Sequence, residues 1–217
     1  MSRCTQALIY KDNLEYNIKQ IKNNVGKNVK VCLAVKADAY GHDAILTSQL
    51  AEKNDIDFLA VATIDEGIEL RDAGIKLPIL LLSLCVPDEF EEIFKNDITP
   101  LVFSKEYINL LIKASESFFS DETKFSVHLA VDTGMGRIGC YPQEAGEEAK
   151  LINNSKNLIL SGMCTHFAVS DSLSQENQEY TKNQYNKFTQ AIQSVKDEGF
   201  DPGICHCACS AAFLNNK

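Results

Sequence analysis

A lysine at position 36 follows a short apolar segment, in a setting that could support covalent chemistry. Across residues 31–35, the bulky residues at 31, 33 and 35 alternate with the smaller Cys32 and Ala34, which predicts a strand with one bulky and one small face. Lys36 falls on the small, inward face at the carboxyl end of this strand. A lysine there is poorly hydrated and loses its proton more readily than a surface lysine, which suits Schiff-base and proton-transfer chemistry. The spacing alone is also consistent with a second interpretation, in which the Lys36 amine extends into solvent at the end of the strand.

The residues around Lys36 favour the chemical interpretation over a lysine that only extends into solvent. Residues 34–42 read Ala-Val-Lys-Ala-Asp-Ala-Tyr-Gly-His and closely resemble the cofactor-lysine motif of alanine racemases, which use pyridoxal 5'-phosphate (PLP). Later segments resemble the same family in the same order, so the resemblance extends over nearly the whole chain. It implies that Lys36 binds PLP covalently and that Tyr40 hydrogen-bonds the phosphate of the cofactor.

A glycine-rich segment, residues 132–139, has two interpretations. Its Gly-Met-Gly-Arg-Ile-Gly portion has the outline of a dinucleotide-binding turn, but the next strand ends at His166 without the carboxylate that such a site requires. The same segment resembles the racemase motif Asp-Thr-Gly-Met-Gly-Arg-Ile-Gly, which implies that Arg137 bonds the phenolic oxygen of PLP and the substrate carboxylate. The fixed fork of a guanidinium suits that role. The segment alone would favour an ion pair between Arg137 and Asp132.

Two later segments continue the resemblance. Residues 165–171, Thr-His-Phe-Ala-Val-Ser-Asp, resemble a family motif whose histidine packs beside the pyridine ring, which implies that role for His166. Residues 206–212, His-Cys-Ala-Cys-Ser-Ala-Ala, resemble the motif His-x-x-Asn-Ser-Ala-Ala. That resemblance implies that Ser210 binds the cofactor phosphate at the N-terminus of a helix, where free N–H groups favour an anion.

The chain departs from the family pattern at two positions. Cys209 stands where the family has asparagine, and Ala130 stands where many members have a lysine that becomes carbamylated and positions the arginine. We therefore expect Arg137 to need another partner, such as a bound anion.

The cysteines predict neither a metal site nor a disulfide framework. In an extended segment, the cysteines at 205, 207 and 209 share one face and His206 takes the other, so they cannot converge on one ion. The eight cysteines lie mostly in apolar strands, which favours buried thiols in a reducing cytoplasm.

The elements that must position these residues alternate between strand and helix. Strands are predicted at 31–36, 58–62, 79–82, 98–102, 125–131, 158–163 and 204–208. Helix starts are marked by possible capping boxes at Asp12 with Glu15 and at Thr63 with Glu66, by Ser104 as a cap, and by Pro142. Strict alternation predicts the α/β class with a parallel sheet, either open or closed into a barrel.

Pattern and resemblance differ on how the barrel is completed. From pattern alone, a short strand within residues 6–10 would bring the count to eight and close a barrel. The resemblance instead implies a (β/α)8 TIM-type barrel over residues 11–217 that lacks its last strand. Residues 1–10 would then hold a strand that pairs with the C-terminal β domain of the family, which is absent from this chain.

Composition limits the partners. The chain has 217 residues, 45% of them apolar, and a formal net charge of −9, which argues against nucleic acid and anionic membranes as partners. The longest apolar run, residues 78–85, is too short to span a bilayer, and the first residues lack the apolar core of a signal peptide.

The resemblance implies PLP-dependent interconversion of L-alanine and D-alanine, which supplies D-alanine for cell-wall peptidoglycan, in a cytoplasmic homodimer. Lys36 would be the base on one face of the substrate. The second base would be a tyrosine from the partner's C-terminal domain, so we expect this chain alone not to racemise alanine at an enzyme-like rate, although Lys36 could still exchange the α-proton. A serine or broad-specificity racemase of the same family is one alternative. Another is a non-catalytic, single-barrel PLP-binding protein, whose lysine lies in a different local sequence.

Overall fold

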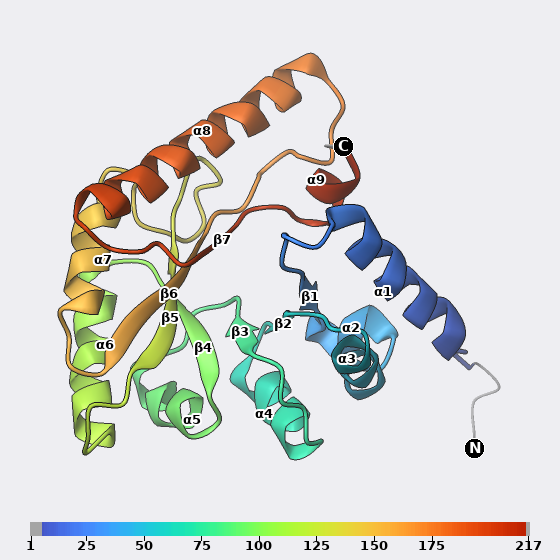
Figure 1. The fold of residues 1–217 in the computed structure, drawn as a ribbon, viewed down its shortest axis with the longest axis horizontal. Helices are drawn as coiled ribbons and strands as arrows, with labels where there is room; N and C mark the ends of the chain where they lie inside the picture. The colour runs from blue at the N-terminus through green and yellow to red at the C-terminus, as the bar shows by residue number, and fades with distance from the viewer. Residues whose placement is uncertain (1–5, 216–217) are drawn as a thin grey trace. The chain divides into compact units, whose positions relative to one another are not determined.

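The computed structural model describes residues 6–215 as two compact units (Figure 1). The first unit comprises the chain up to Cys85 together with Lys95–Ile98, and the second comprises Val86–Phe94 and the chain from Thr99 onward. Strands and helices alternate through both units, and the strand pairs within each unit are parallel. The predicted α/β class is therefore confirmed. The division of the chain into residues 1–10 and 11–217 stays a prediction.

The first unit contains three parallel strands in the order β1-β2-β3. Its elements are α1 (Lys11–Val25), β1 (Cys32–Ala34), α2 (Lys36–Gly41), α3 (Ala44–Lys53), β2 (Phe58–Val61), α4 (Ile64–Asp72) and β3 (Ile79–Leu81). Leu59, Val61 and Ile79 are fully buried, because parallel strands covered by helices bury side chains on both faces.

Local sequence signals explain where some of these helices begin and end. The Thr63 hydroxyl accepts a hydrogen bond from the Glu66 N–H, and the Glu66 carboxylate accepts one from the Thr63 N–H, so the predicted capping box at α4 is confirmed. The box predicted at Asp12 is wrong, because α1 begins at Lys11 and Asp12 lies inside its first turn. Residues 6–10 form no strand, since a strand exists only where a neighbouring strand completes its hydrogen bonds.

The second unit contains the strand order β4-β5-β6-β7. Its elements are η1 (Pro87–Glu89), α5 (Phe90–Lys95), β4 (Ile98–Val102), α6 (Lys105–Phe118), β5 (Phe125–Ala130), α7 (Ala145–Asn153), β6 (Leu158–Cys164), α8 (Gln175–Asp197), β7 (Ile204–His206) and α9 (Ser210–Asn215). Helices α6, α7 and α8 succeed one another along one side of these strands (Figure 1). As predicted, Ser104 caps α6 by accepting a hydrogen bond from the Tyr107 N–H.

Two predicted boundaries in this unit are wrong. Helix α7 begins at Ala145 rather than Pro142, because Tyr141 and Glu144 exchange hydrogen bonds that close a turn before the helix. Strand β7 ends at His206 rather than at residue 208, since no parallel pairing continues beyond His206 in the described chain.

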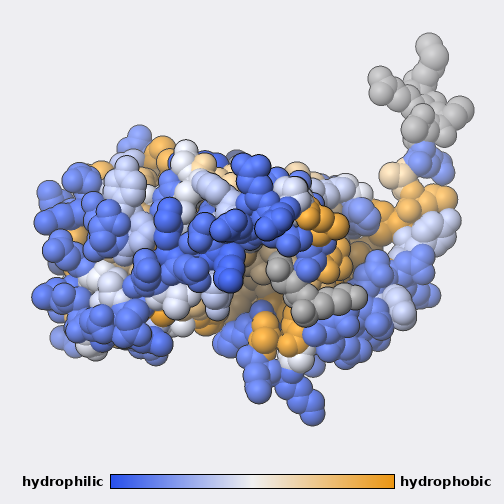
Figure 2. Space-filling model, turned by 90° about the horizontal axis from the view of Figure 1, so that it is seen from above, coloured by the Kyte–Doolittle hydropathy of each residue, from blue (hydrophilic) through white to orange (hydrophobic). Residues whose placement is uncertain are grey.

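Most of the face seen in Figure 2 is hydrophilic, in keeping with the acidic composition. Among residues 6–215, no helix has both the length and the apolar character needed to cross a bilayer.

Arg71, near the end of α4, binds the loop that precedes β3 and the loop that precedes β4. Its guanidinium donates to the carbonyl oxygens of Ile75 and Leu77 at 3.0 and 2.8 Å, and to those of Asn96 and Asp97 at 2.9 Å each. Burial lowers the pKa of Arg71, and the charges of Asp97 and Glu52 oppose that effect. This one side chain therefore satisfies four carbonyl groups that no regular element pairs.

We expect Arg71→Lys to lower the free energy of unfolding by about 2 kcal/mol, because an ammonium group cannot reach four carbonyls arranged around a planar fork. Urea denaturation measures the change. Lys76→Ala, at an exposed position nearby, is the control and should cost less than about 0.5 kcal/mol. Equal losses for the two variants would contradict this role for Arg71.

Glu148 on α7 is a buried carboxyl group, only 6% exposed. It accepts hydrogen bonds from the Cys140 thiol and from the Lys105 N–H, whereas its Oε2 atom has no partner within the described residues. Burial raises the pKa of Glu148 to about 7, and the charges of Glu144 and Glu106 act in the same direction. The protonated form is therefore favoured in the folded protein.

We expect this carboxyl group to make the protein less stable as the pH rises from 4.5 to 7. The unfolded chain releases the proton first, so the loss amounts to at most about 3 kcal/mol. Glu148→Gln should remove this part of the pH dependence, measured as the free energy of unfolding in urea at several pH values. Parallel pH profiles for the wild type and Glu148→Gln would show that the group is not buried as described.

Candidate active site

Lys36 begins a left-handed turn directly after β1. The Val35 N–H still bonds the Ala60 carbonyl at 2.9 Å, so the β1–β2 ladder continues up to the residue before the lysine. Residues 37–40 then have φ between 51° and 55° and ψ between 39° and 52°, and Gly41 has φ 80°. A left-handed helical conformation costs about 1–2 kcal/mol for each residue with a Cβ atom, so this turn is strained.

Tertiary contacts hold the strained turn in place. The Ala39 N–H bonds the Val35 carbonyl at 2.8 Å, which closes the turn. Glu66 accepts from the Ala37 N–H at 2.8 Å with one carboxylate oxygen and from the Ala62 N–H at 2.7 Å with the other. The capping glutamate of α4 thus also anchors the turn that carries Lys36.

The far end of the turn is held in a similar way. Asp38 accepts from the Ala44 N–H at 2.8 Å, which ties the turn to the start of α3. Lys36 is half-buried, and within residues 6–215 its amine forms no ion pair or hydrogen bond. Tyr40 is 64% exposed. The predicted end of the first strand at residue 36 is wrong, because β1 ends at Ala34 and Lys36 opens the turn that follows. Lys36 still lies just beyond the carboxyl end of β1, and both side chains are available to a ligand.

In the second unit, Arg137 lies in the loop that follows β5. Asp132 Oδ1 accepts from the Gly134 and Gly136 N–H groups at 2.9 and 3.1 Å, so this carboxylate organises the loop. The ion pair between Asp132 and Arg137 that the segment alone would favour is not formed. Arg137 is exposed, and its guanidinium has no partner in the described part of the chain.

Glycine is required where this loop closes. Gly139 has φ 136°, and a Cβ atom there would collide with the backbone of Val131 and Asp132. The Asp132 N–H bonds the Cys140 carbonyl at 2.8 Å, and the Cys140 N–H bonds the Ala130 carbonyl at 3.0 Å. The glycines of the segment therefore let the chain return tightly to the end of β5.

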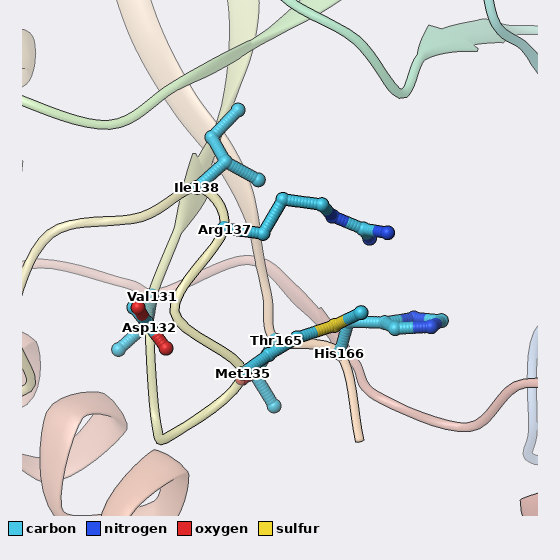
Figure 3. A pocket seen from close by; sticks show the side chains of 7 residues that line it. All are labelled: Val131, Asp132, Met135, Arg137, Ile138, Thr165 and His166. Atoms are coloured by element: carbon cyan, nitrogen blue, oxygen red, sulfur yellow. The ribbon is translucent and has the colours of Figure 1, made fainter. Parts of the chain in front are cut away.

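His166 follows β6 and shares a small pocket with Arg137. Val131, Asp132, Met135, Ile138 and Thr165 complete the lining. Figure 3 shows that the Arg137 and His166 side chains extend from their two loops toward the same side. The structure therefore brings these two predicted site residues together.

Ser210 is the first residue of α9 and is exposed. The preceding Cys209 takes the capping position: its carbonyl accepts from the Phe213 N–H, and its sulfur lies 3.3 Å from the Ser170 hydroxyl. Burial raises the pKa of Cys209, but hydrogen bonds from Ser170 and from the Ala212 and Ala211 N–H groups outweigh this and leave the pKa below its usual value. The thiol thus accepts hydrogen bonds where the family motif has an asparagine.

A pair of histidines lies beside these loops. His128 Nδ1 is 3.1 Å from His206 Nε2, and His128 is only 2% exposed. Gly162 makes room for the His128 ring, because a Cβ atom there would lie 2.5 Å from Cε1. Residues 128 and 206 are 78 positions apart, so local sequence could not predict the pair. Ala130, two residues farther along β5, is 3% exposed.

Both histidines are held neutral at ordinary pH. Burial lowers the pKa of His128 to about 3, and the charge of His206 adds to the effect. Burial lowers the pKa of His206 to about 4. Neutral rings can share a single N–H···N hydrogen bond, whereas two imidazolium rings would repel each other.

We expect the free energy of unfolding to fall as the pH drops from 6.5 toward 4. The unfolded chain takes up protons near pH 6.5 while the folded chain does not, so each histidine contributes at most about 1.4 kcal/mol per pH unit. His128→Gln should reduce this slope in urea denaturation, because one of the two groups is gone. An unchanged slope in that variant would contradict the pairing.

Comparisons with known proteins agree with these features. The family model described as "Alanine racemase, N-terminal domain" matches residues 9–217. The alanine racemase of Treponema denticola is 49% identical over 212 residues, which cover 98% of this chain and 55% of that protein. Alanine racemase 1 of Caldanaerobacter subterraneus is 36% identical over 214 residues, 98% of this chain and 54% of that protein.

The solved structure of alanine racemase from Clostridium difficile 630 has a TM-score of 0.87 and 40% identity, and it covers 94% of this chain and 55% of its own. Alanine racemase from Oenococcus oeni has a TM-score of 0.83 and 31% identity, with coverage of 96% and 57%. The chain therefore spans about half the length of the proteins it matches, and it belongs to the alanine racemase family.

Proposed function

We propose that this chain forms the PLP-binding part of an alanine racemase, which interconverts L-alanine and D-alanine. The observation that carries the proposal is Lys36 at the end of β1, presented by a strained turn that Glu66 and Asp38 hold in place. Strain of this kind persists where the surrounding structure fixes it, and it concentrates at functional sites. Membership of the alanine racemase family supports the same assignment.

The donor groups suit PLP. An amine without an ion-pair partner, that of Lys36, matches the aldehyde of the cofactor. The exposed hydroxyl groups of Tyr40 and Ser210 match a phosphate, as do the N–H groups at the start of α9. The unpaired guanidinium of Arg137 matches an anionic oxygen. No group among these conflicts with the cofactor.

When bound, PLP supplies a conjugated ring that takes up the charge left by removal of the α-proton. We assign the covalent attachment and the α-proton transfer to the Lys36 amine. Arg137 orients the carboxylate of the amino acid, and Tyr40 and Ser210 hold the phosphate. His166 lies beside Arg137 and would pack against the ring of the bound cofactor. A neutral amine is required for proton abstraction, so Lys36 must be deprotonated at that step.

We extend the proposal to the whole protein to which this chain corresponds. Its strands would belong to a (β/α)8 barrel, a homodimer in the cytoplasm would be the working form, and the D-alanine would serve peptidoglycan synthesis. The relatives are named alanine racemases, which favours alanine over serine or a broad range of amino acids. It also disfavours a non-catalytic PLP-binding protein.

We expect the folded chain mixed with PLP to develop the visible absorption band of lysine-bound PLP. Borohydride should fix the cofactor on the peptide that contains Lys36, as read by mass spectrometry. Lys36→Ala should lose both signals, because no other lysine among residues 6–215 follows a strand through such a left-handed turn. Lys27→Ala, an exposed lysine before the same strand, is the matched control and should keep both. The same band and labelled peptide profile in Lys36→Ala would overturn the assignment.

A further inference from the structure

A buried glutamine on α8 connects the two loops that carry Arg137 and His166. Gln184 is 1% exposed. Its Nε2 donates to the Thr133 hydroxyl at 3.2 Å and to the His166 carbonyl at 3.1 Å, and its Oε1 accepts from the Ala168 N–H at 2.9 Å. Both amide donors and the carbonyl oxygen are therefore used within the protein.

The two loops also contact each other at this glutamine. The hydroxyl groups of Thr133 and Thr165 lie 2.8 Å apart, and both residues are buried. Thr133 opens the loop that holds Arg137, and Thr165 immediately precedes His166. Gln184, Thr133, Thr165 and the backbone of residues 166–168 thus form one buried polar network, which we call the loop anchor.

A second residue of α8 supports the Arg137 loop. Tyr180 lies one helical turn before Gln184, on the same face of the helix. Its hydroxyl donates to the Gly134 carbonyl at 2.6 Å. Helix α8 therefore binds the approach to Arg137 at two points, the Thr133 hydroxyl and the Gly134 carbonyl, although the Arg137 side chain has no partner in the described chain.

We propose that Gln184 is a positioning residue that fixes the Arg137 loop and the His166 loop relative to each other. The proposal rests on the function proposed above, in which both side chains serve PLP and its substrate. Gln184 touches neither ligand. Its amide holds backbone and hydroxyl groups of both loops in a buried setting, where each unmade hydrogen bond would leave a desolvated polar group. Such a network has one well-satisfied arrangement, and that arrangement sets the separation of the two side chains.

Amide hydrogen exchange tests the loop anchor directly. Gln184→Met keeps the length of the side chain and removes its hydrogen bonds. Exchange should become about tenfold faster in both segments 132–139 and 165–169, since loss of the anchor lowers the cost of opening them together. Thr133→Val, which removes one hydroxyl of the network, should also accelerate exchange in both segments. This variant decides the question if Gln184→Met does not fold.

Val195→Ala is the control for a purely structural effect. Val195 is fully buried on the same helix but forms no part of the loop anchor, so its truncation destabilises the unit without touching the loops. Its exchange in the two segments should match the wild type. If Gln184→Met and Val195→Ala give the same exchange profile, or if Gln184→Met accelerates exchange uniformly, Gln184 is only a core residue and the proposal is overturned.

A PLP titration then tests the consequence for the site. Gln184→Met should bind PLP about tenfold more weakly than the wild type and shift the visible band, whereas Val195→Ala should do neither. Unchanged affinity and band in Gln184→Met would overturn the positioning role. If the wild type itself takes up no PLP at Lys36, the proposed function fails, and the exchange measurement still decides whether Gln184 couples the loops.

Discussion

The left-handed turn after β1 is the constraint on which the rest of the site depends. Four consecutive residues with Cβ atoms, residues 37–40, adopt a backbone conformation that such residues normally avoid. Several kcal/mol of strain must be offset by contacts that exist only in the folded protein. Glu66 and Asp38 supply those contacts, and both are carboxylates that accept backbone N–H groups. The turn ends the strand abruptly and leaves the Lys36 amine available for chemistry.

In the second unit, one carboxylate and one buried amide hold the loops that carry the site residues. Its loops after β5 and β6 carry Arg137 and His166, which both lie outside the helices and strands. Asp132 organises the first loop from within, and Gln184 ties it to the second from a helix. Cys209 accepts hydrogen bonds at the start of α9, where the family pattern has asparagine. A cysteine at position 209 therefore still caps α9, with a thiol in place of the side-chain amide of the family's asparagine.

The sequence predicts the regular elements well because their signals are local. Alternation of apolar strands with helices, the Thr63–Glu66 box and the Ser104 cap each act within a few residues. The left-handed turn was not predicted, since Ala-Asp-Ala-Tyr has no local preference for positive φ and the bracing carboxylate comes from α4. The Asp132–Arg137 ion pair was a wrong alternative, because the loop N–H groups compete for the same carboxylate.

The candidate site was predicted from motifs rather than from physical pattern. Lys36, Arg137 and His166 gained their roles from resemblance to a family, and geometry then showed that Arg137 and His166 share a pocket. Gln184 and the His128–His206 pair could not be found in this way. Each depends on contacts between segments far apart in the chain, and a glutamine in an amphipathic helix or a histidine in a strand is ordinary by itself.

The central claim is that Lys36 moves the α-proton of alanine when PLP is bound. The most direct measurement is the incorporation of deuterium at the α-carbon of alanine in D2O, followed by NMR with PLP in excess. The account predicts incorporation at least about a hundredfold faster with the wild type than with Lys36→Ala, since the base is removed in that variant. Equal rates for the two proteins, with PLP bound to the wild type, would contradict it.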